Sequence, residues 1–375
     1  MRRILFYIIL TCWQLTAVSQ KTVHLARVRN TANFNSGEQL VSIPWTVVQA
    51  KCMNPDTAMF SVVDASSGNT IAYQFETLGT GKIQNLLLLV SLSAGTHINI
   101  KYVRKKNPVF TSRTYGRFVP ERKDDFAWEN DRIAFRMYGK ALQVTNENAY
   151  GNDVCEKRTY SMIIDKWYKT ADYHTDHGEG LDYYSVGTTL GAGNNTFYWN
   201  DTPVYLGNFS RFKVLDNGPL RTAFTLYYDA VTIGNNTITV AKTMTLDAGA
   251  QFNRVEVVYT INDNKVVSTV TGIAKRKDAG VVLMDEKKGM MLYWEPTHPQ
   301  HGTTGVAVID TSSNRKLFFN NQQLLMRADI VPNQAYTYYT GACWDKAGVI
   351  TDFDSWHQYI NKYCERLKKP LVINY

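Results

Sequence analysis

Two neighbouring stretches give the strongest indication of fold class, FSRFKVLDNGPLRTAFTLYYDAVTI (209–233) and TITVAKTMTLDAGAQFNRVEVVYTI (237–261). Both are rich in the β-branched and aromatic residues that favour β-strands. Asn217-Gly218 and Gly234-Asn235-Asn236 interrupt them with residues typical of tight turns. The two stretches therefore predict a series of strands joined by short turns.

Similar strand-like segments lie before and after these two stretches. Strand-sized runs precede these stretches at 41–50, 59–76 and 84–103, and others follow at 306–310, 316–320, 324–330 and 335–344. Many strands with few helices are typical of two-sheet sandwiches. We therefore predict an all-β protein. We expect a small N-terminal β-sandwich over residues 20–108 and a large antiparallel β-supersandwich, the expected catalytic domain, over residues 109–375.

One helix is predicted, at the C-terminal end, from TDFDSWHQYINKYCERLKK (351–369). Its apolar side chains recur at helical spacing and form one face, which we expect to pack on the sandwich. Asp352 or Asp354 can cap the first turn, and Pro370 ends the helix. The members of this face are Phe353, Trp356, Ile360, Tyr363, Cys364 and Leu367.

The first residues, MRRILFYIILTCWQLTAVSQ, have the organisation of a secretory signal peptide. A basic start precedes an apolar run, and small residues follow at the expected cleavage site. We predict a signal peptide over 1–19, cleavage after Ser19, a periplasmic or secreted protein, and no integral membrane segment after cleavage. Four cysteines remain in the mature chain, and we expect mostly free, buried thiols.

The net charge of +8 favours anionic partners. The chain has no long Lys/Arg run and no nucleic-acid-binding motif, so we expect no nucleic acid partner. It also has no P-loop, no GxGxxG and no GxSxG, which argues against nucleotide chemistry and an α/β-hydrolase site. We expect no cofactor and no metal.

The stretch YHTDHGEGLDYYSVG (173–187) carries the highest density of chemistry-bearing side chains. Its glycines break any helix, so the stretch is expected to form a loop or strand edge, where functional residues concentrate. Histidine can act as a general base and tyrosine as an acid or base. The candidate catalytic residues are Tyr173, His174, His177, Tyr183 and Tyr184, with Glu179 and Asp182 as substrate-binding residues. The alternative is a polar loop with its own hydrogen-bond network.

A second candidate segment is YGRFVPERKDDFAWEND (115–131). Its arginines could form paired hydrogen bonds to a carboxylate, and its tryptophan could stack on a sugar. The predicted substrate-binding residues here are Arg117, Glu121, Arg122, Asp125 and Trp128; the alternative is a surface of weak ion pairs. In RTYSMIIDKWYK (158–169), Lys166 could add a contact. For that segment, and for the loop YWEPTHPQHG (293–302) with Glu295, His298 and His301, a structural role is favoured.

Several segments together resemble one known family: YGRFVPERKDDFAWENDRIAFRMYG, IIDKWY, YHTDHGEGLDYYSVGTTLGAG, DNGPLRTAFTLYY and MTLDAGAQFNRVEVVY. The family consists of secreted proteins catalogued as a domain of unknown function, and the resemblance covers nearly the whole mature chain. It implies a place among gene sets that degrade acidic plant and algal polysaccharides. It also implies a relationship to uronate oligosaccharide dehydratases or lyases and a galactose-mutarotase-like supersandwich. Because a fold alone does not define an activity, the roles of residues are inferred from chemistry.

The leading hypothesis is β-elimination at a uronate in an acidic oligosaccharide or polysaccharide, by a lyase or dehydratase. This reaction needs a positive group beside the carboxylate, a base for the adjacent proton and an acid for the leaving oxygen. We expect Arg117 and Arg122 in the first role, His174 or His177 in the second, and a tyrosine of the 173–187 stretch in the third. The alternatives are a glycoside hydrolase with paired carboxylates, with or without a metal, and a non-catalytic glycan-binding protein.

Overall fold

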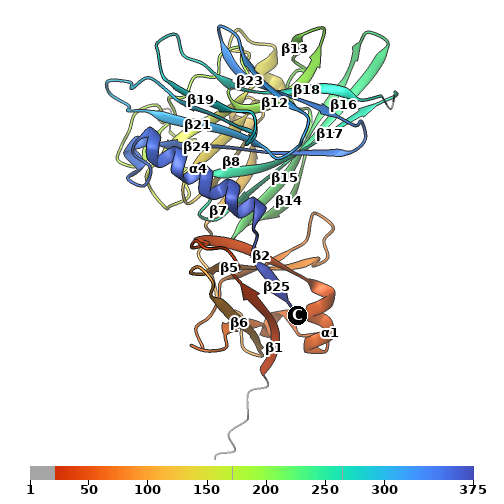
Figure 1. Ribbon diagram of the computed structural model, residues 1–375, viewed down its shortest axis with the longest axis vertical. Coiled ribbons are helices and arrows are strands. Elements are labelled where there is room, and N and C mark those ends of the chain that lie inside the picture. Colours follow the sequence, from red (N-terminus) through yellow and green to blue (C-terminus); the bar gives the residue numbers. More distant parts are fainter. Residues whose placement is uncertain (1–21, 171, 264) are drawn as a thin grey trace, which may run out of the picture.

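The computed structural model describes residues 22–170, 172–263 and 265–375. The predicted signal peptide, residues 1–19, lies outside the described residues. Antiparallel sheets dominate, and one long helix lies near the C-terminal end, so the predicted all-β class with a C-terminal helix is confirmed. Figure 1 shows a larger β-structure stacked on a smaller one.

The smaller structure consists of two sheets around their own apolar core. The strand order is β25-β1-β6-β3 in one sheet and β2-β5-β4 in the other. Their bounds are β1 Thr22–Arg29, β2 Glu38–Pro44, β3 Ser61–Asp64, β4 Tyr73–Glu76, β5 Asn85–Ser91, β6 His97–Val103 and β25 Val372–Asn374. A helix, α1 (Trp45–Cys52), and a 3-10 turn, Thr57–Met59, lie between β2 and β3.

The final strand is a feature that the sequence did not predict. β25 pairs antiparallel with β1, so Arg27 lies opposite Asn374 and Arg29 opposite Val372. The chain therefore returns from the larger structure to the first sheet, as the path from α4 to β25 in Figure 1 shows. The predicted domain division at residue 108 stays a prediction.

The larger structure is built on an eight-stranded sheet with the order β14-β15-β16-β17-β24-β21-β20-β19. The bounds are β14 Arg211–Asn217, β15 Arg221–Ile233, β16 Asn236–Asp247, β17 Phe252–Ile261, β19 Val281–Asp285, β20 Met290–Trp294, β21 Thr304–Asp310 and β24 Ala335–Trp344. The two opening stretches of sequence form β14 to β17. On β16, Ile238, Val240, Met244 and Leu246 are buried at alternate positions, because successive side chains point to opposite faces of a strand.

Two five-stranded sheets cover one face of this sheet. The first has the order β13-β12-β18-β23-β22, with β12 Ala192–Trp199, β13 Thr202–Val204, β18 Val267–Ala274, β22 Arg315–Phe319 and β23 Gln323–Ile330. The second has the order β11-β10-β9-β8-β7, with β7 Thr114–Val119, β8 Asp125–Asn130, β9 Ala134–Met137, β10 Asn152–Lys157 and β11 Gly180–Leu181. The remaining short elements are α2 (Lys140–Gln143), α3 (Ile164–Trp167) and the 3-10 turns Pro120–Arg122 and Asp345–Ala347.

One apolar core joins the covering sheets to the eight-stranded sheet. Phe126 of β8 stacks on Phe224 of β15 with ring centroids 3.9 Å apart, and Trp128 meets Phe224 edge-on at 5.0 Å. Phe197 of β12 and Met326 of β23 are buried in the same core. Burial of such side chains is the main favourable term in folding. It holds the covering sheets, and the loops between them, in fixed positions.

Helix α4 (Phe353–Lys368) packs through a second apolar cluster on the eight-stranded sheet. Trp356, Ile360 and Cys364 are buried as predicted, and Trp356 stacks on Phe252 with ring centroids 5.6 Å apart. Asp352 caps the helix by accepting a hydrogen bond from the Ser355 backbone N–H at 2.7 Å. The predicted helix, its cap and its packing face are therefore confirmed.

Candidate active site

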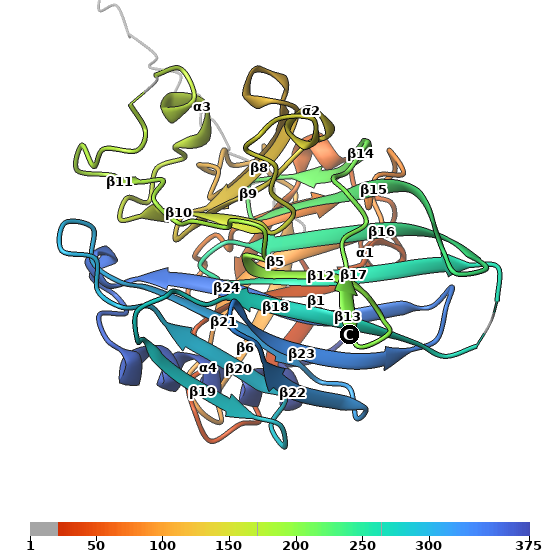
Figure 2. The ribbon, with the colours of Figure 1, turned by 90° about the horizontal axis from the view of Figure 1, so that it is seen from above.

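An open cleft lies where the second covering sheet approaches the eight-stranded sheet. Two adjoining cavities, of about 470 and 390 Å³, share Tyr183 and Ser185. Figure 2 shows β10 and β11 on the same side of the molecule as the C-terminal end of β24. The loop after β11 and the loop between β20 and β21 form the cavity walls. Clefts of this size are typical of small-ligand sites.

Tyr183 stands where the two cavities meet, and its hydroxyl belongs to a chain of polar groups. This hydroxyl shares a hydrogen bond with the Thr304 hydroxyl at 2.9 Å, and Thr304 donates to Oε1 of Glu156 at 2.7 Å. Burial raises the pKa of Tyr183 above its usual range. Burial also raises the pKa of Glu156 well above that of an ordinary carboxyl group. The phenol therefore keeps its proton at neutral pH.

A proton on Glu156 changes the direction of this chain. A protonated carboxyl group is a donor, so it can donate to Thr304, and Thr304 can then donate to the phenol oxygen. The phenol proton can then point to the Gly302 carbonyl, 3.4 Å away, or into the cleft. Glu156 and Thr304 are thus positioning residues for a Tyr183 that can serve as a general acid.

The wall opposite Tyr183 is the loop between β20 and β21, which carries two histidines. His298 and Gly302 form an isolated bridge with backbone bonds of 2.8 and 3.0 Å. Nδ1 of His298 accepts from the backbone N–H groups of Gln300 and His301 at 3.3 and 3.2 Å. The carbonyl of His301 accepts from Trp344 Nε1 at 2.7 Å, which ties the loop to the end of β24. The backbone of this loop is therefore held in place.

The His301 ring lies 5.2 Å from the Tyr183 ring, centroid to centroid. Desolvation is the main cause that lowers the pKa of His301, and His298 and Lys346 lower it further. A lowered pKa leaves the imidazole neutral at physiological pH, and a neutral imidazole can accept a proton. A protonated phenol thus lies at the cleft with a neutral imidazole packed beside it, and His298 of the same loop lines the smaller cavity.

Arg276 and Glu295 form an ion pair at 2.7 Å in the smaller cavity. Burial raises the pKa of Glu295 to about 7, although Arg276 opposes the shift. The Arg276 guanidinium also lies over the Tyr184 ring, 4.5 Å from its centroid. Because Glu295 is partly protonated near neutral pH, Arg276 is not permanently neutralised and can pair with an anionic ligand.

Arg136 is buried behind the larger cavity among three carboxylates. It contacts Asp153 closely, and it lies 3.2 Å from Asp182 and 3.8 Å from Asp125. Tyr138 donates to Asp153 at 2.8 Å. Burial raises the pKa of Asp125 to about 7 and also raises the pKa of Asp182, although Arg136 opposes both shifts. Three carboxylates around one cation exceed its charge, so the cluster retains a proton more readily than isolated acids do.

The beginning of the 173–187 stretch lies beside this cluster. Nδ1 of His174 is hydrogen-bonded to the Asp182 carbonyl at 2.6 Å, and His174 lines the larger cavity. Tyr173 is buried, with the Arg122 guanidinium 4.5 Å from its ring centroid. The buried hydroxyl of Tyr184 has no hydrogen-bond partner among the described residues. The structure thus brings together His174, Asp182, Tyr183 and Tyr184 at the cleft, with Tyr173, Arg122 and Asp125 behind it.

The remaining predicted site residues lie elsewhere. Arg117 forms ion pairs with Glu121 and Asp165, each at 2.6 Å. Lys166 pairs with Glu179 at 2.7 Å, and the exposed His177 pairs with Asp172 at 3.0 Å. None of these predicted residues lines either cavity of the cleft.

Trp128 requires a correction of the predicted stacking role. It is completely buried, stacks on Phe135 with centroids 5.6 Å apart, and donates from Nε1 to Asn253 at 2.7 Å. This placement leaves neither face of the ring for a sugar. Trp128 is a core residue.

The sequence analysis missed five residues of the site: Arg136, Asp153, Glu156, Arg276 and Thr304. Three of them lie on β9 and β10, whose residues are buried along their whole length. The sequence did contain an indication of this buried cluster: charged residues occur within two short strand-like runs, AFRM and NDVCEK. A buried charge needs a partner, so two such runs together indicate a buried polar cluster. The loop at 293–302 carried visible residues, but a structural role was favoured for it.

The described residues contain neither a metal-binding group nor a membrane-spanning helix. In residues 22–170, 172–263 and 265–375, no group of three or more His, Cys, Asp or Glu side chains is placed to hold a metal ion. The helices of the same residues include none that is long and apolar enough to cross a membrane. Cys52, Cys155, Cys343 and Cys364 are free and buried, which confirms the expectation for these four thiols.

The protein is thus an all-β protein with an open cleft, and the charged cluster around Arg136 is buried beside this cleft. The chain belongs to the family described as Domain of unknown function (DUF4861), whose model matches residues 28–373. It is 31% identical over 339 residues to the "Uncharacterized protein P7" of Formosa agariphila, and the alignment covers 84% of each chain.

Similar solved structures are larger proteins. A protein in the Glycosyl Hydrolase Family 38 from Enterococcus faecalis has a TM-score of 0.48 at 8% identity, covering 94% of this chain and 47% of that one. An alpha-mannosidase from Enterococcus faecalis V583 has a TM-score of 0.47 at 9% identity, covering 94% and 46%. The chain thus spans about half the length of these solved structures.

Proposed function

We propose that the protein is a carbohydrate-active enzyme that acts on uronic-acid-containing oligosaccharides or polysaccharides by β-elimination, as a lyase or dehydratase. The observation that carries this proposal is the pair formed by Tyr183 and His301. The pKa of the phenol is raised and the pKa of the imidazole is lowered, so one group holds a proton and the other accepts one. Groups whose environments separate their protonation states in this way are the usual acid and base of a catalytic site.

In the proposed reaction, His301 takes the proton from C5, the carbon next to the uronate carboxylate. The electrons form the C4–C5 double bond, and the substituent on C4 leaves with a proton from Tyr183. Negative charge that develops on the carboxylate is stabilised by Arg276 and by the protonated form of Glu295. Preorganised donors of this kind usually supply a large share of the rate enhancement in enzymes.

This assignment moves two roles away from the residues that the sequence indicated. Arg117 is held by two carboxylates outside the cleft, so Arg276 takes its place. His174 lines the larger cavity, and its Nδ1 donates to the Asp182 carbonyl. We assign the base to His301 instead, because its ring lies 5.2 Å from the ring of the proposed acid and its pKa is lowered. His174 and Asp182 remain candidates for binding the neighbouring sugar. The acid stays within the predicted tyrosines.

The acidic substrate class is supported by charge and by resemblance. Arg276 is a cation in the cleft whose partner carboxyl group has a pKa of about 7. A substrate carboxylate can therefore compete for the guanidinium, which binds carboxylates with two parallel hydrogen bonds. The family resemblance of the matched segments independently implies acidic plant or algal polysaccharides.

The test is to incubate the mature protein with a panel of uronate-containing oligosaccharides. Ultraviolet absorbance detects the conjugated double bond, and mass spectrometry identifies the products. Elimination predicts a rise in absorbance that His301→Gln abolishes, while the His177→Gln control retains it, because His177 lies outside the cleft. Intact substrates throughout would refute catalysis and favour a non-catalytic glycan-binding protein.

A second candidate function, glycoside hydrolysis, is favoured by one observation. Asp182 and Glu295 are buried carboxyl groups in the two adjoining cavities, and burial raises the pKa of each. Most glycosidases use a pair of carboxyl groups, one of which keeps its proton through a raised pKa. Shorter, saturated products that disappear with both Asp182→Asn and Glu295→Gln would favour this function over elimination.

We also propose that the protein is periplasmic or secreted, on the basis of the signal-peptide pattern in residues 1–19. Expression of the full chain in a Gram-negative host tests this. Mature protein in the periplasm or medium that begins after Ser19 is the expected result. An uncleaved chain in the cytoplasm would contradict it.

A further inference from the structure

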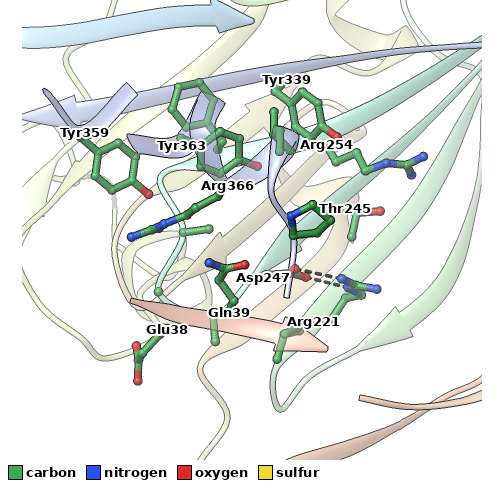
Figure 3. A pocket seen from close by; sticks show the side chains of 17 residues that line it. Glu38, Gln39, Arg221, Thr245, Asp247, Arg254, Tyr339, Tyr359, Tyr363 and Arg366 are labelled. Atoms are coloured by element: carbon green, nitrogen blue, oxygen red, sulfur yellow. Dashed lines mark hydrogen bonds and ion pairs between the residues drawn. The ribbon is translucent and has the colours of Figure 1, made fainter. Parts of the chain in front are cut away.

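A second pocket lies between the larger and smaller structures, away from the cleft. Its volume is about 280 Å³, and its walls come from β2, β16, β17, β24 and α4. Figure 3 shows Tyr339, Tyr359, Tyr363 and Arg366 on one side, with Glu38, Gln39 and the Asp247–Arg221 pair on the other. None of its lining residues lines the catalytic cleft.

The upper wall of this pocket is aromatic and fixed. Tyr363 stacks on Phe252 with ring centroids 4.6 Å apart and meets Tyr339 edge-on at 5.7 Å. The Tyr359 hydroxyl accepts from the Gln251 backbone N–H at 3.0 Å. Rigid aromatic rings with polar tips offer a flat surface and hydrogen-bonding groups with little loss of conformational entropy.

The carboxylates of the pocket already have partners. Asp247 binds Arg221 through two hydrogen bonds of 2.6 and 2.9 Å, and Glu38 binds Arg113 through two of 3.0 and 2.7 Å. The cation Arg254 pairs with Glu256 at 2.5 Å. These groups are therefore balanced without a ligand.

Arg366 differs from these groups. No hydrogen bond or ion pair joins its guanidinium to another residue in the described part of the chain, and its Nε is buried without a partner. The guanidinium packs against the Gly37 backbone, where an added Cβ atom would lie 2.6 Å from Nη2. Gly37 has a φ of +62°, a conformation that favours glycine. An arginine that has no carboxylate partner can bind an anion through charge-assisted hydrogen bonds.

We propose that this pocket is a second carbohydrate site, which binds one anionic sugar residue of the uronate class apart from the catalytic cleft. The sugar carboxylate pairs with Arg366, and its ring packs on the tyrosine wall. The volume fits a single sugar rather than a long chain. The choice of a sugar rests on the proposed function, whereas the anion preference rests on Arg366 alone.

Calorimetric titration of the intact mature protein with glucuronate, and with glucose as the neutral counterpart, tests this inference. The wild-type protein should bind two glucuronates, one in each site. Arg366→Gln should weaken one of them by about tenfold or more, since a lost charge-assisted hydrogen bond is worth about 1.5–3 kcal/mol. Arg276→Gln should weaken the other, and glucose should bind the Arg366 pocket more weakly than glucuronate.

The variants separate the two claims. If Arg366→Gln leaves glucuronate binding unchanged, or if glucose binds equally well at the Arg366-dependent site, the inference is wrong. If only Arg276→Gln has no effect, the second site stands and the proposed cleft chemistry fails. Arg366→Lys, which keeps the charge but lacks the planar fork, should bind with intermediate affinity and serves if the glutamine variant does not fold.

Discussion

Replacing Tyr183 by phenylalanine removes one hydroxyl group and leaves the ring in place. The hydroxyl makes a hydrogen bond of 2.9 Å to Thr304 in a half-buried position, so its loss should cost about 1 kcal/mol of folding stability. As the proposed general acid, the same hydroxyl should be worth about 10²- to 10⁴-fold in rate. That range corresponds to roughly 3–5 kcal/mol of transition-state stabilisation. The catalytic effect therefore exceeds the structural one.

The assay is the initial rate of double-bond formation, measured by ultraviolet absorbance over a range of substrate concentrations. Tyr183→Phe should lower kcat strongly and change KM little, because the retained ring keeps its contacts. The matched control is Tyr205→Phe. The half-buried Tyr205 also uses its hydroxyl in one side-chain hydrogen bond, to Gln323 at 3.1 Å, but it lies outside the cleft. A Tyr183→Phe enzyme with the kcat of the Tyr205→Phe enzyme would refute the role of the phenol.

The remaining predictions concern pH, charge and the helix. The acid limb of kcat/KM should lie below pH 6.5, since the pKa of the base His301 is lowered from 6.5; a limb above that value in a pH–rate profile would contradict this assignment. Folded Glu295 holds its proton more tightly than the unfolded chain, so the free energy of unfolding should fall as pH rises from about 4.5 to 7. Glu295→Gln should reduce this fall by about 3 kcal/mol or less in denaturant titrations at both ends of the window, and an unchanged slope would be the contrary result. Asp352→Ala should destabilise the protein by about 1 kcal/mol through loss of the helix cap, and Trp356→Ala by about 3–5 kcal/mol, as thermal and chemical denaturation can show; equal effects would argue against the packing of α4.

The sequence predicted the strands well where one stretch of chain determined them. Turn residues at Asn217-Gly218 and Gly234-Asn235-Asn236 separate β14, β15 and β16 as expected. The amphipathic pattern of 351–369 determined α4 together with its cap, because both depend on residues within a few turns. The pairing of β25 with β1 was not predicted, since it joins residues more than 340 positions apart and has no local signal.

The site was predicted only in part, because the sequence indicates residues that lie close together in the chain but not their distant partners. The 173–187 stretch contributes His174, Asp182, Tyr183 and Tyr184 to the cleft, because one glycine-rich loop carries them all. Their partners lie far away in the sequence. Thr304, which is hydrogen-bonded to Tyr183, and Arg276, which lies over the Tyr184 ring, each follow this stretch by tens of residues or more. Burial also reversed one expectation. Trp128 was expected to stack on a sugar, but the alternation of β8 turns its ring into the core.

Burial separates the carboxyl groups of the cleft from the ordinary ion pairs of the surface. Arg117 and Lys166 are exposed enough for water to compete with their partners, and pairs of this kind contribute little. Glu156 and Glu295 are buried, so the protein must hold them either protonated or paired. The cost of keeping such groups is expected at a functional site, where perturbed pKa values concentrate.

The most direct test of the central claim follows the hydrogen on C5 of the uronate. An oligosaccharide deuterated at that carbon is incubated with the mature protein, and each product is analysed by mass spectrometry. Elimination through His301 predicts unsaturated products that have lost the deuterium, with a slower rate than for the undeuterated substrate if proton removal limits turnover. Saturated products that retain the deuterium would contradict elimination and point to hydrolysis at the same cleft.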